Sequence, residues 1–231
     1  MNEIRISTEE ELERLRDRID LEASEAADHF YLLKGLDESR TEYYLEMNES
    51  STFWHLTFIA HRDAVLSRLC RLYDQAGAAL SLHRFLLTVK AHRDDFFSEE
   101  AFRKRLKANL HIDTLVEGRA INDSDLDREL TSVSASDPFV SRLSAFRNTV
   151  LSHTDANKVR NGTQQLWLPV EDIEALLGRA RAITGKYSLL FRASMYSGIA
   201  GADDYKSTLQ WLRKALSNHR AQIDREAALS R

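Results

Sequence analysis

Glycine and proline are scarce in this chain, and their scarcity limits the folds that it can adopt. The 231 residues include only 8 Gly and 2 Pro. Sheet-rich folds need many tight turns, and tight turns depend strongly on these two residue types. The sequence therefore predicts long helices with few breaks, and the fold class expected is all-α.

Apolar residues recur three or four positions apart along most of the chain, which is the spacing of one helix face. Ser7 and Thr8 precede Glu10 and Glu11 at the spacing of a capping box, so the first helix is expected to begin near residue 8. The expected helices span about 8–48 (one long helix, or one bent once at Gly35), 51–74, 79–94, 98–110, 125–130, 138–153, 169–198 and 204–227. Only residues 163–168 (TQQLWL) hint at extended structure.

The length fits one domain over residues 1–231, with a core over about 10–200 and an additional C-terminal helix over about 204–227. Hydrophobic residues make up 43% of the chain and charged residues 29%, which is an ordinary globular balance. The formal net charge of −4 argues against a broad nucleic-acid surface but leaves room for a small local one.

Nothing in the sequence predicts a membrane partner or export. No apolar run approaches the roughly 20 residues that cross a bilayer, and the acidic N-terminus lacks the pattern of a signal peptide. The single cysteine, Cys70, lies on an apolar helix face, where a buried and inert thiol is expected. Together these features predict a cytoplasmic protein.

The helix expected at 138–153 (PFVSRLSAFRNTVLSH) carries the strongest functional signal. Asp137 and Pro138 form an N-cap followed by a first-turn proline, so the start of this helix is well defined. With Leu143 placed at zero on the helical wheel, Arg147 falls at about +40°, inside the apolar arc, and His153 at about −80°, on its edge. A guanidinium in an apolar arc needs compensation, either from a carboxylate elsewhere in the bundle or from an open cleft that admits an anion.

These residues suit the cleavage of a phosphodiester in RNA. His153 can take a proton from the 2′-hydroxyl or protonate the leaving oxygen, and Arg147 can stabilise the charge on the phosphorane. Asn148 adds a polar group beside the arginine, and Lys158 and Arg160 in the following loop complete a local basic patch that can bind substrate. No metal or cofactor is expected, because the nucleophile is already part of the substrate.

The spacing of arginine and histidine alone has little weight, because Arg-x5-His also occurs at 105–111 and 213–219. The site at 147–153 differs in its place at a helix end, in the arginine within the apolar arc and in the asparagine that follows it. His55 and His61 lie six residues apart on one expected helix, and this is not metal-ligand spacing, so core or surface histidines are expected there.

The segment SRLSAFRNTVLSHTD resembles the signature of HEPN domains, in which an arginine, usually followed by a polar residue, precedes a histidine with four to six residues between them. Arg147, Asn148 and His153 match it position by position. Residues 53–75, the helical plan and the length resemble the abortive-infection, AbiU-like branch of these proteins. The resemblance implies an HEPN-like helical bundle with a long N-terminal helix. It also implies a homodimer whose two motifs share one cleft, and a metal-independent endoribonuclease that acts as a toxin or anti-phage effector, with a possible antitoxin partner.

One position departs from the pattern, and one alternative function stays open. Some toxin-type members carry a modified tyrosine two residues after the histidine, and here that position is Asp155. The alternative to a ribonuclease is a non-catalytic HEPN scaffold that binds a partner protein or a nucleotide. A solvent-filled groove shared by two symmetry-related Arg147/His153 sets would favour the enzyme, whereas a closed salt bridge from Arg147 to a carboxylate would favour the scaffold.

Overall fold

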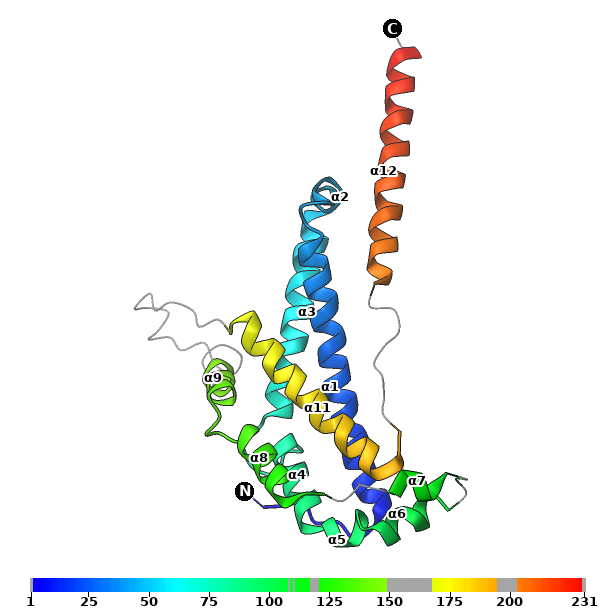
Figure 1. Ribbon diagram of the computed structural model, residues 1–231. Helices are drawn as coiled ribbons and strands as arrows, with labels where there is room; N and C mark the ends of the chain where they lie inside the picture. The colour runs from blue at the N-terminus through cyan, green and yellow to red at the C-terminus, as the bar shows by residue number, and fades with distance from the viewer. Residues whose placement is uncertain are drawn as a thin grey trace, which may run out of the picture. The chain divides into compact units, whose positions relative to one another are not determined.

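The computed structural model describes residues 2–107, 109, 111–116, 121–148, 168–194 and 203–229. These residues form helices and no strand, so the predicted all-α class is confirmed (Figure 1). In chain order the helices are α1 (Glu9–Glu38), α2 (Tyr44–Glu49), α3 (Ser51–Leu72), α4 (Leu82–Ala91), α5 (Arg93–Phe96), α6 (Glu99–Arg105), α7 (Ile112–Val116), α8 (Asp123–Ser132), α9 (Pro138–Phe146), α11 (Val170–Arg192) and α12 (Asp204–Leu229).

The capping box expected at the start of the first helix is present at α1. The Glu11 amide donates to Thr8 Oγ1 at 3.2 Å, and the Thr8 and Ser7 amides donate to Glu11 Oε2 at 3.2 Å and 2.6 Å. These reciprocal bonds satisfy amides that the first helical turn leaves unpaired, and they also hold the pKa of the Glu11 carboxyl below its usual value.

The expected bend at Gly35 is wrong. Helix α1 continues through Gly35 to Glu38, and the turn before α2 lies at residues 39–43. A Cβ atom at Gly35 would lie 2.5 Å from the phenol oxygen of Tyr205. The glycine is therefore needed for the close approach of Tyr205 from α12, not for a change in the direction of α1.

The contacts of the chain group it into two compact units, Met1–Ala26 with Leu66–Ser197 and Ala27–Val65 with Gly198–Arg231. The expectation of one domain over 1–231 stays a prediction. The first unit is held by contacts such as the buried hydrogen bond from the Tyr73 hydroxyl to the Leu176 carbonyl, at 2.7 Å. It also contains the candidate site.

The second unit joins the end of α1, helix α2 and the first part of α3 to α12. Its core consists of Leu36, Tyr43, Met47, Trp54 and Leu209. Arg213 of α12 donates to Glu46 Oε1 at 2.9 Å and lies 4.0 Å from the centre of the Tyr43 ring. The C-terminal helix expected at 204–227 is thus present, and it packs through its first turns.

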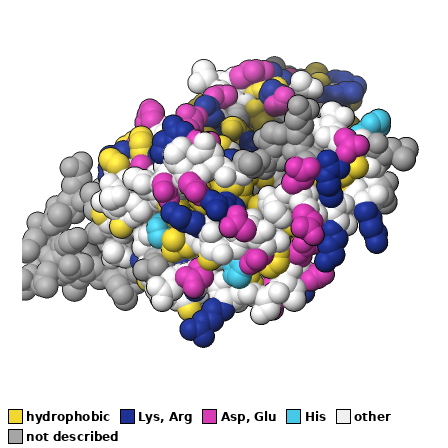
Figure 2. Space-filling model, turned by 60° about the horizontal axis from the view of Figure 1, so that its bottom comes forward, with side chains coloured by type: hydrophobic (Ala, Val, Ile, Leu, Met, Phe, Trp, Pro, Cys, Tyr) yellow, Lys and Arg dark blue, Asp and Glu magenta, His cyan; other side chains and the backbone are white. Residues whose placement is uncertain are grey.

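Two further expectations concern the surface and the membrane. On the face seen in Figure 2, Lys and Arg side chains alternate with Asp and Glu, without a broad patch of one sign. Among the parts of the chain that the structure describes, every helix is too short or too polar to cross a bilayer.

Candidate functional site

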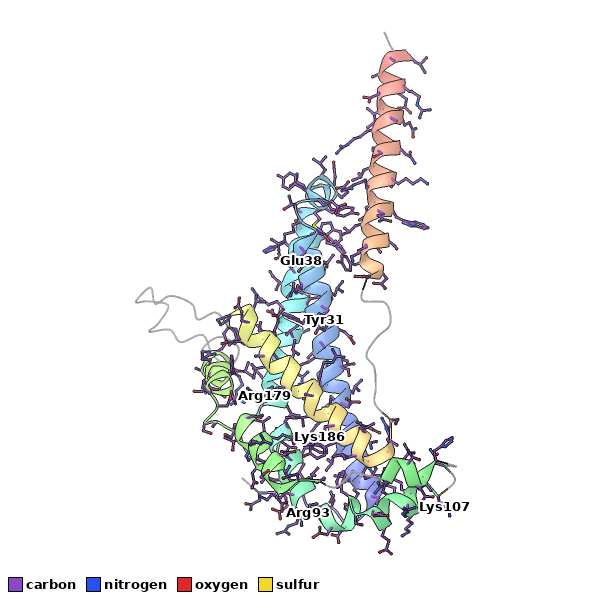
Figure 3. All side chains as sticks on the ribbon, viewed as in Figure 1. Tyr31, Glu38, Arg93, Lys107, Arg179 and Lys186 are labelled. Carbon is purple, nitrogen blue, oxygen red and sulfur yellow. The ribbon has the colours of Figure 1, made fainter. Side chains whose placement is uncertain are left out.

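Helix α9 begins where the sequence predicts, and its first turn is fixed by one carboxylate. Asp137 Oδ1 accepts hydrogen bonds from the amides of Phe139 at 2.9 Å and Val140 at 3.2 Å. The same oxygen lies 3.0 Å from Nη1 of Arg179, which projects from α11 (Figure 3). The start of α9 is therefore held both by its own cap and by an ion pair to the neighbouring helix.

A second ion pair fastens the middle of α9 to α11. Nε and Nη2 of Arg142 donate to the two carboxylate oxygens of Asp172, at 2.5 Å and 2.8 Å. The Asp172 side chain is only 8% exposed. Val140, Leu143 and Phe146 of α9 are buried, as the apolar arc predicts. Packing and the bidentate pair together set the direction in which the end of α9 points.

Arg147 follows the last residue of α9 and meets a carboxylate from another part of the chain. Its backbone stays helical (φ −51°, ψ −52°), and Arg147 and Asn148 lie in a π-helical turn, a local widening that is frequent at functional sites. Nη1 of Arg147 donates to Asp74 Oδ1 at 2.8 Å. The side chains of Arg147 and Asp74 are 28% and 23% exposed. The arginine is thus paired, as its place in the apolar arc requires, but water still reaches the pair.

Asp74 lies in the turn after α3 and is itself held in place. Its Oδ1 accepts the Ala76 amide at 2.9 Å, in addition to the Arg147 guanidinium. One hydrogen bond, between one nitrogen and one oxygen, joins Arg147 to Asp74, whereas two parallel bonds join Arg142 to Asp172. A single-point, partly exposed pair is weaker than a bidentate one, so an incoming anion can compete with Asp74 for Arg147.

Of the other predicted site residues, only Asn148 is described. It is exposed, and its Oδ1 accepts a hydrogen bond from Nε of Arg147 at 3.3 Å. Arg147 is thus held between Asp74 and Asn148. His153, Lys158 and Arg160 lie outside the described residues, as does Asp155, so their approach to Arg147 stays a prediction.

Cys70 lies near this site, and its thiol is buried. Burial raises the pKa of its thiol to about 11, although the positive charge of Arg147 acts in the opposite direction. The thiol is therefore protonated at neutral pH. The predicted burial of this cysteine is confirmed, and its inertness stays a prediction.

The sequence places Asp74 at a helix end but does not predict that it pairs with Arg147. The apolar arc showed that Arg147 needs a partner but gave no means of choosing among 36 acidic residues. One signal was present, because Asp74 directly follows Leu72 and Tyr73, both 2% exposed, at the end of an apolar helix face. A carboxylate in that position lies at the edge of the core, where a half-buried arginine can reach it.

The histidines of the long helices form a contact that their spacing did not predict. His61 of α3 lies against His29 of α1, with their Nδ1 atoms 2.8 Å apart. Burial lowers the pKa of His61, and the neighbouring His29 adds to the effect. Within the described ranges, no three His, Cys, Asp or Glu side chains gather in a way that could hold a metal ion.

The described residues thus define an all-helical protein with a partly exposed arginine at the end of a short, firmly anchored helix. A family model, described as the HEPN family AbiU2, matches residues 9–216. The chain therefore belongs to the HEPN abortive-infection family AbiU2. No curated protein and no solved structure matches the chain.

Proposed function

We propose that this protein is a metal-independent endoribonuclease of the HEPN type, acting in the cytoplasm as a toxin or anti-phage effector. The observation that carries the proposal is the position of Arg147 in a chain of this family: at a helix end, partly exposed and bonded to Asp74 through one nitrogen and one oxygen. A guanidinium in that state can exchange its carboxylate partner for a phosphate.

In the proposed reaction, the 2′-hydroxyl oxygen attacks the adjacent phosphorus while the bond from phosphorus to the 5′ oxygen breaks. His153 removes the 2′ proton or supplies the proton that the leaving 5′ oxygen needs. Arg147 binds the phosphate and stabilises the added negative charge of the phosphorane. The products are a 2′,3′-cyclic phosphate and a 5′-hydroxyl end.

The remaining residues position the substrate. Asn148 orients Arg147, which is consistent with the hydrogen bond from Arg147 Nε to Asn148 Oδ1. Lys158 and Arg160 hold flanking phosphates by charge. The proposal includes a homodimer, because two copies of His153 in one cleft would supply a base and an acid for the two proton transfers. An antitoxin that covers this cleft is the expected protein partner.

The proposal is tested by expressing the protein in bacteria beside its Arg147→Ala and His153→Ala variants. Wild type is expected to slow growth and to fragment cellular RNA, and both variants are expected to do neither at matched protein levels. Arg128→Ala is the matched control, since Arg128 is an exposed arginine that pairs with Asp125 on α8. Fragmentation of RNA by the two site variants at the wild-type rate would rule out this mechanism.

One observation favours a second candidate function, a non-catalytic scaffold that binds a partner protein or nucleotide. Arg147 does meet an internal carboxylate, Asp74, as a scaffold requires. The scaffold further requires that this pair is closed and permanent. The two functions differ in how much the Arg147–Asp74 pair contributes to the free energy of unfolding, and replacement of Asp74 measures that contribution.

A further inference from the structure

A cavity of about 240 Å³ lies beside the Arg147 site. Its wall includes Asp74, the carboxylate that binds Arg147, and it lies between α1 and the end of α3. Arg18 and Glu22 line it from α1, and Arg71 lines it from α3. A ligand in this cavity and a phosphate on Arg147 would therefore be neighbours that share Asp74.

One buried carboxylate, Glu22, binds both arginines of the cavity wall and a third arginine, Arg68, beside them. Glu22 is 5% exposed and accepts hydrogen bonds from Nη2 of Arg18 at 3.1 Å, Nη1 of Arg68 at 3.3 Å and Nε of Arg71 at 2.6 Å. A carboxylate bound by three guanidiniums fixes their orientation and leaves their combined charge positive. Arg68 also pairs with Glu25.

The two arginines of the cavity wall face water. The wall itself is balanced in charge, with Arg18 and Arg71 against Glu22 and Asp74, and Arg68 and Arg147 lie beside it, paired with Glu22, Glu25 and Asp74. The side chains of Arg18 and Arg71 are 61% and 52% exposed. They therefore keep N–H groups for an anion, in a protein whose net charge is −4.

The rest of the wall is apolar. Ile19 and Leu72 are buried, at 2% exposure each, so the apolar surface that a ligand can contact comes from Ala79 and Leu80, which are half-buried. An apolar surface beside guanidinium groups fits a flat base next to its phosphate, which is how proteins bind single-stranded RNA. The volume suits one nucleotide and excludes a duplex.

We propose that this cavity is a subsite for one nucleotide of a single-stranded RNA, next to the phosphate on Arg147. Arg18 and Arg71 bind the phosphate of that nucleotide, and Leu80 contacts its base. The subsite rests on the proposed function, because it assigns a further part of the same substrate. It predicts cleavage in single-stranded regions and not within a duplex.

The test measures binding of a 12-nucleotide single-stranded RNA by fluorescence anisotropy, in a His153→Ala background that prevents cleavage. Arg18→Gln and Arg71→Gln are each expected to weaken binding about five- to tenfold, and to lower the salt dependence by about one phosphate contact. Leu80→Ala is expected to weaken binding without changing the salt dependence. Arg128→Gln is the charge-matched control. Because Arg18 is an exposed residue paired within its own helix, its variant is expected to fold as wild type does.

The outcomes separate this subsite from the proposed function. Loss of affinity in the Arg18 and Arg71 variants, with wild-type binding in the Arg128 variant, supports the subsite even if wild type cuts no RNA; in that case only the nuclease is refuted. Equal affinity in all four arginine and leucine variants overturns the subsite, even if wild type cleaves RNA. Binding of no RNA at all overturns the subsite as well.

Discussion

Replacing Asp74 with asparagine is expected to destabilise the protein only slightly and to strengthen RNA binding. The asparagine keeps an oxygen for the Ala76 amide, so the turn after α3 is preserved while the charge is lost. Opposite charges about 4 Å apart attract by about 4 kcal/mol at an effective dielectric constant near 20. Desolvation and side-chain ordering oppose most of this in a pair that is 28% and 23% exposed, so the net loss expected is about 1 kcal/mol.

Asp172→Asn provides the matched comparison, because it breaks the bidentate pair with Arg142. Asp172 is 8% exposed and accepts two short hydrogen bonds, so its replacement is expected to cost about 2 kcal/mol, after allowance for the half-exposed Arg142. Urea unfolding followed by circular dichroism measures both changes. In thermal melts, each kcal/mol corresponds to a shift of about 2–4 °C for a chain of this size.

The two variants together decide whether Arg147 is available to a substrate. If Asp74 only occupies Arg147 until a phosphate arrives, Asp74→Asn binds single-stranded RNA several times more tightly than wild type. The reasoning is refuted if Asp74→Asn costs as much stability as Asp172→Asn and also weakens RNA binding. That result would mean that the Arg147 pair is a permanent structural contact, as the scaffold function requires.

Three further predictions concern single residues of the fold. Because burial, and next to it His29, holds the pKa of His61 below 6.5 in the folded chain, the free energy of unfolding is expected to fall as the pH drops below about 6.5 towards that lowered value; His61→Gln should flatten the slope, and an unchanged slope would contradict the lowering of this pKa. Cys70 is expected to react with a thiol reagent at neutral pH only when the protein unfolds, and rapid labelling of the native protein would show that the thiol is not buried. Asp137→Ala removes the cap of α9 and its ion pair with Arg179, so a loss of about 1–2 kcal/mol is expected in urea unfolding; a loss below 0.5 kcal/mol would show that the cap does not hold the helix.

The helices could be predicted from local chemistry, because their starts depend on residues that are close in sequence. The capping box at Thr8 and Glu11 and the Asp137-Pro138 start of α9 are both confirmed. Gly35 shows the limit of this reasoning. Its role depends on Tyr205, 170 positions further along the chain, and no local pattern shows that approach.

The sequence could predict that Arg147 needs a charged partner, but not which residue that partner is. Helix phase alone marked Arg147 as a guanidinium requiring compensation, and the structure supplies Asp74. That choice depends on how the end of α3 packs beside α9, which is a tertiary property. The cavity between Arg18 and Arg71 could not be predicted for the same reason, since its two arginines come from separate helices and are brought together by Glu22.

The central claim is tested most directly by incubating purified protein with an end-labelled single-stranded RNA in the presence of EDTA. Wild type is expected to cleave the RNA without added metal and to leave 2′,3′-cyclic phosphate and 5′-hydroxyl ends. Arg147→Ala and His153→Ala are expected to cleave at least 100-fold more slowly, as loss of a charge-stabilising or proton-transferring group implies. Cleavage that requires a metal ion, products with 5′-phosphate ends, or equal rates in the two variants would contradict the account.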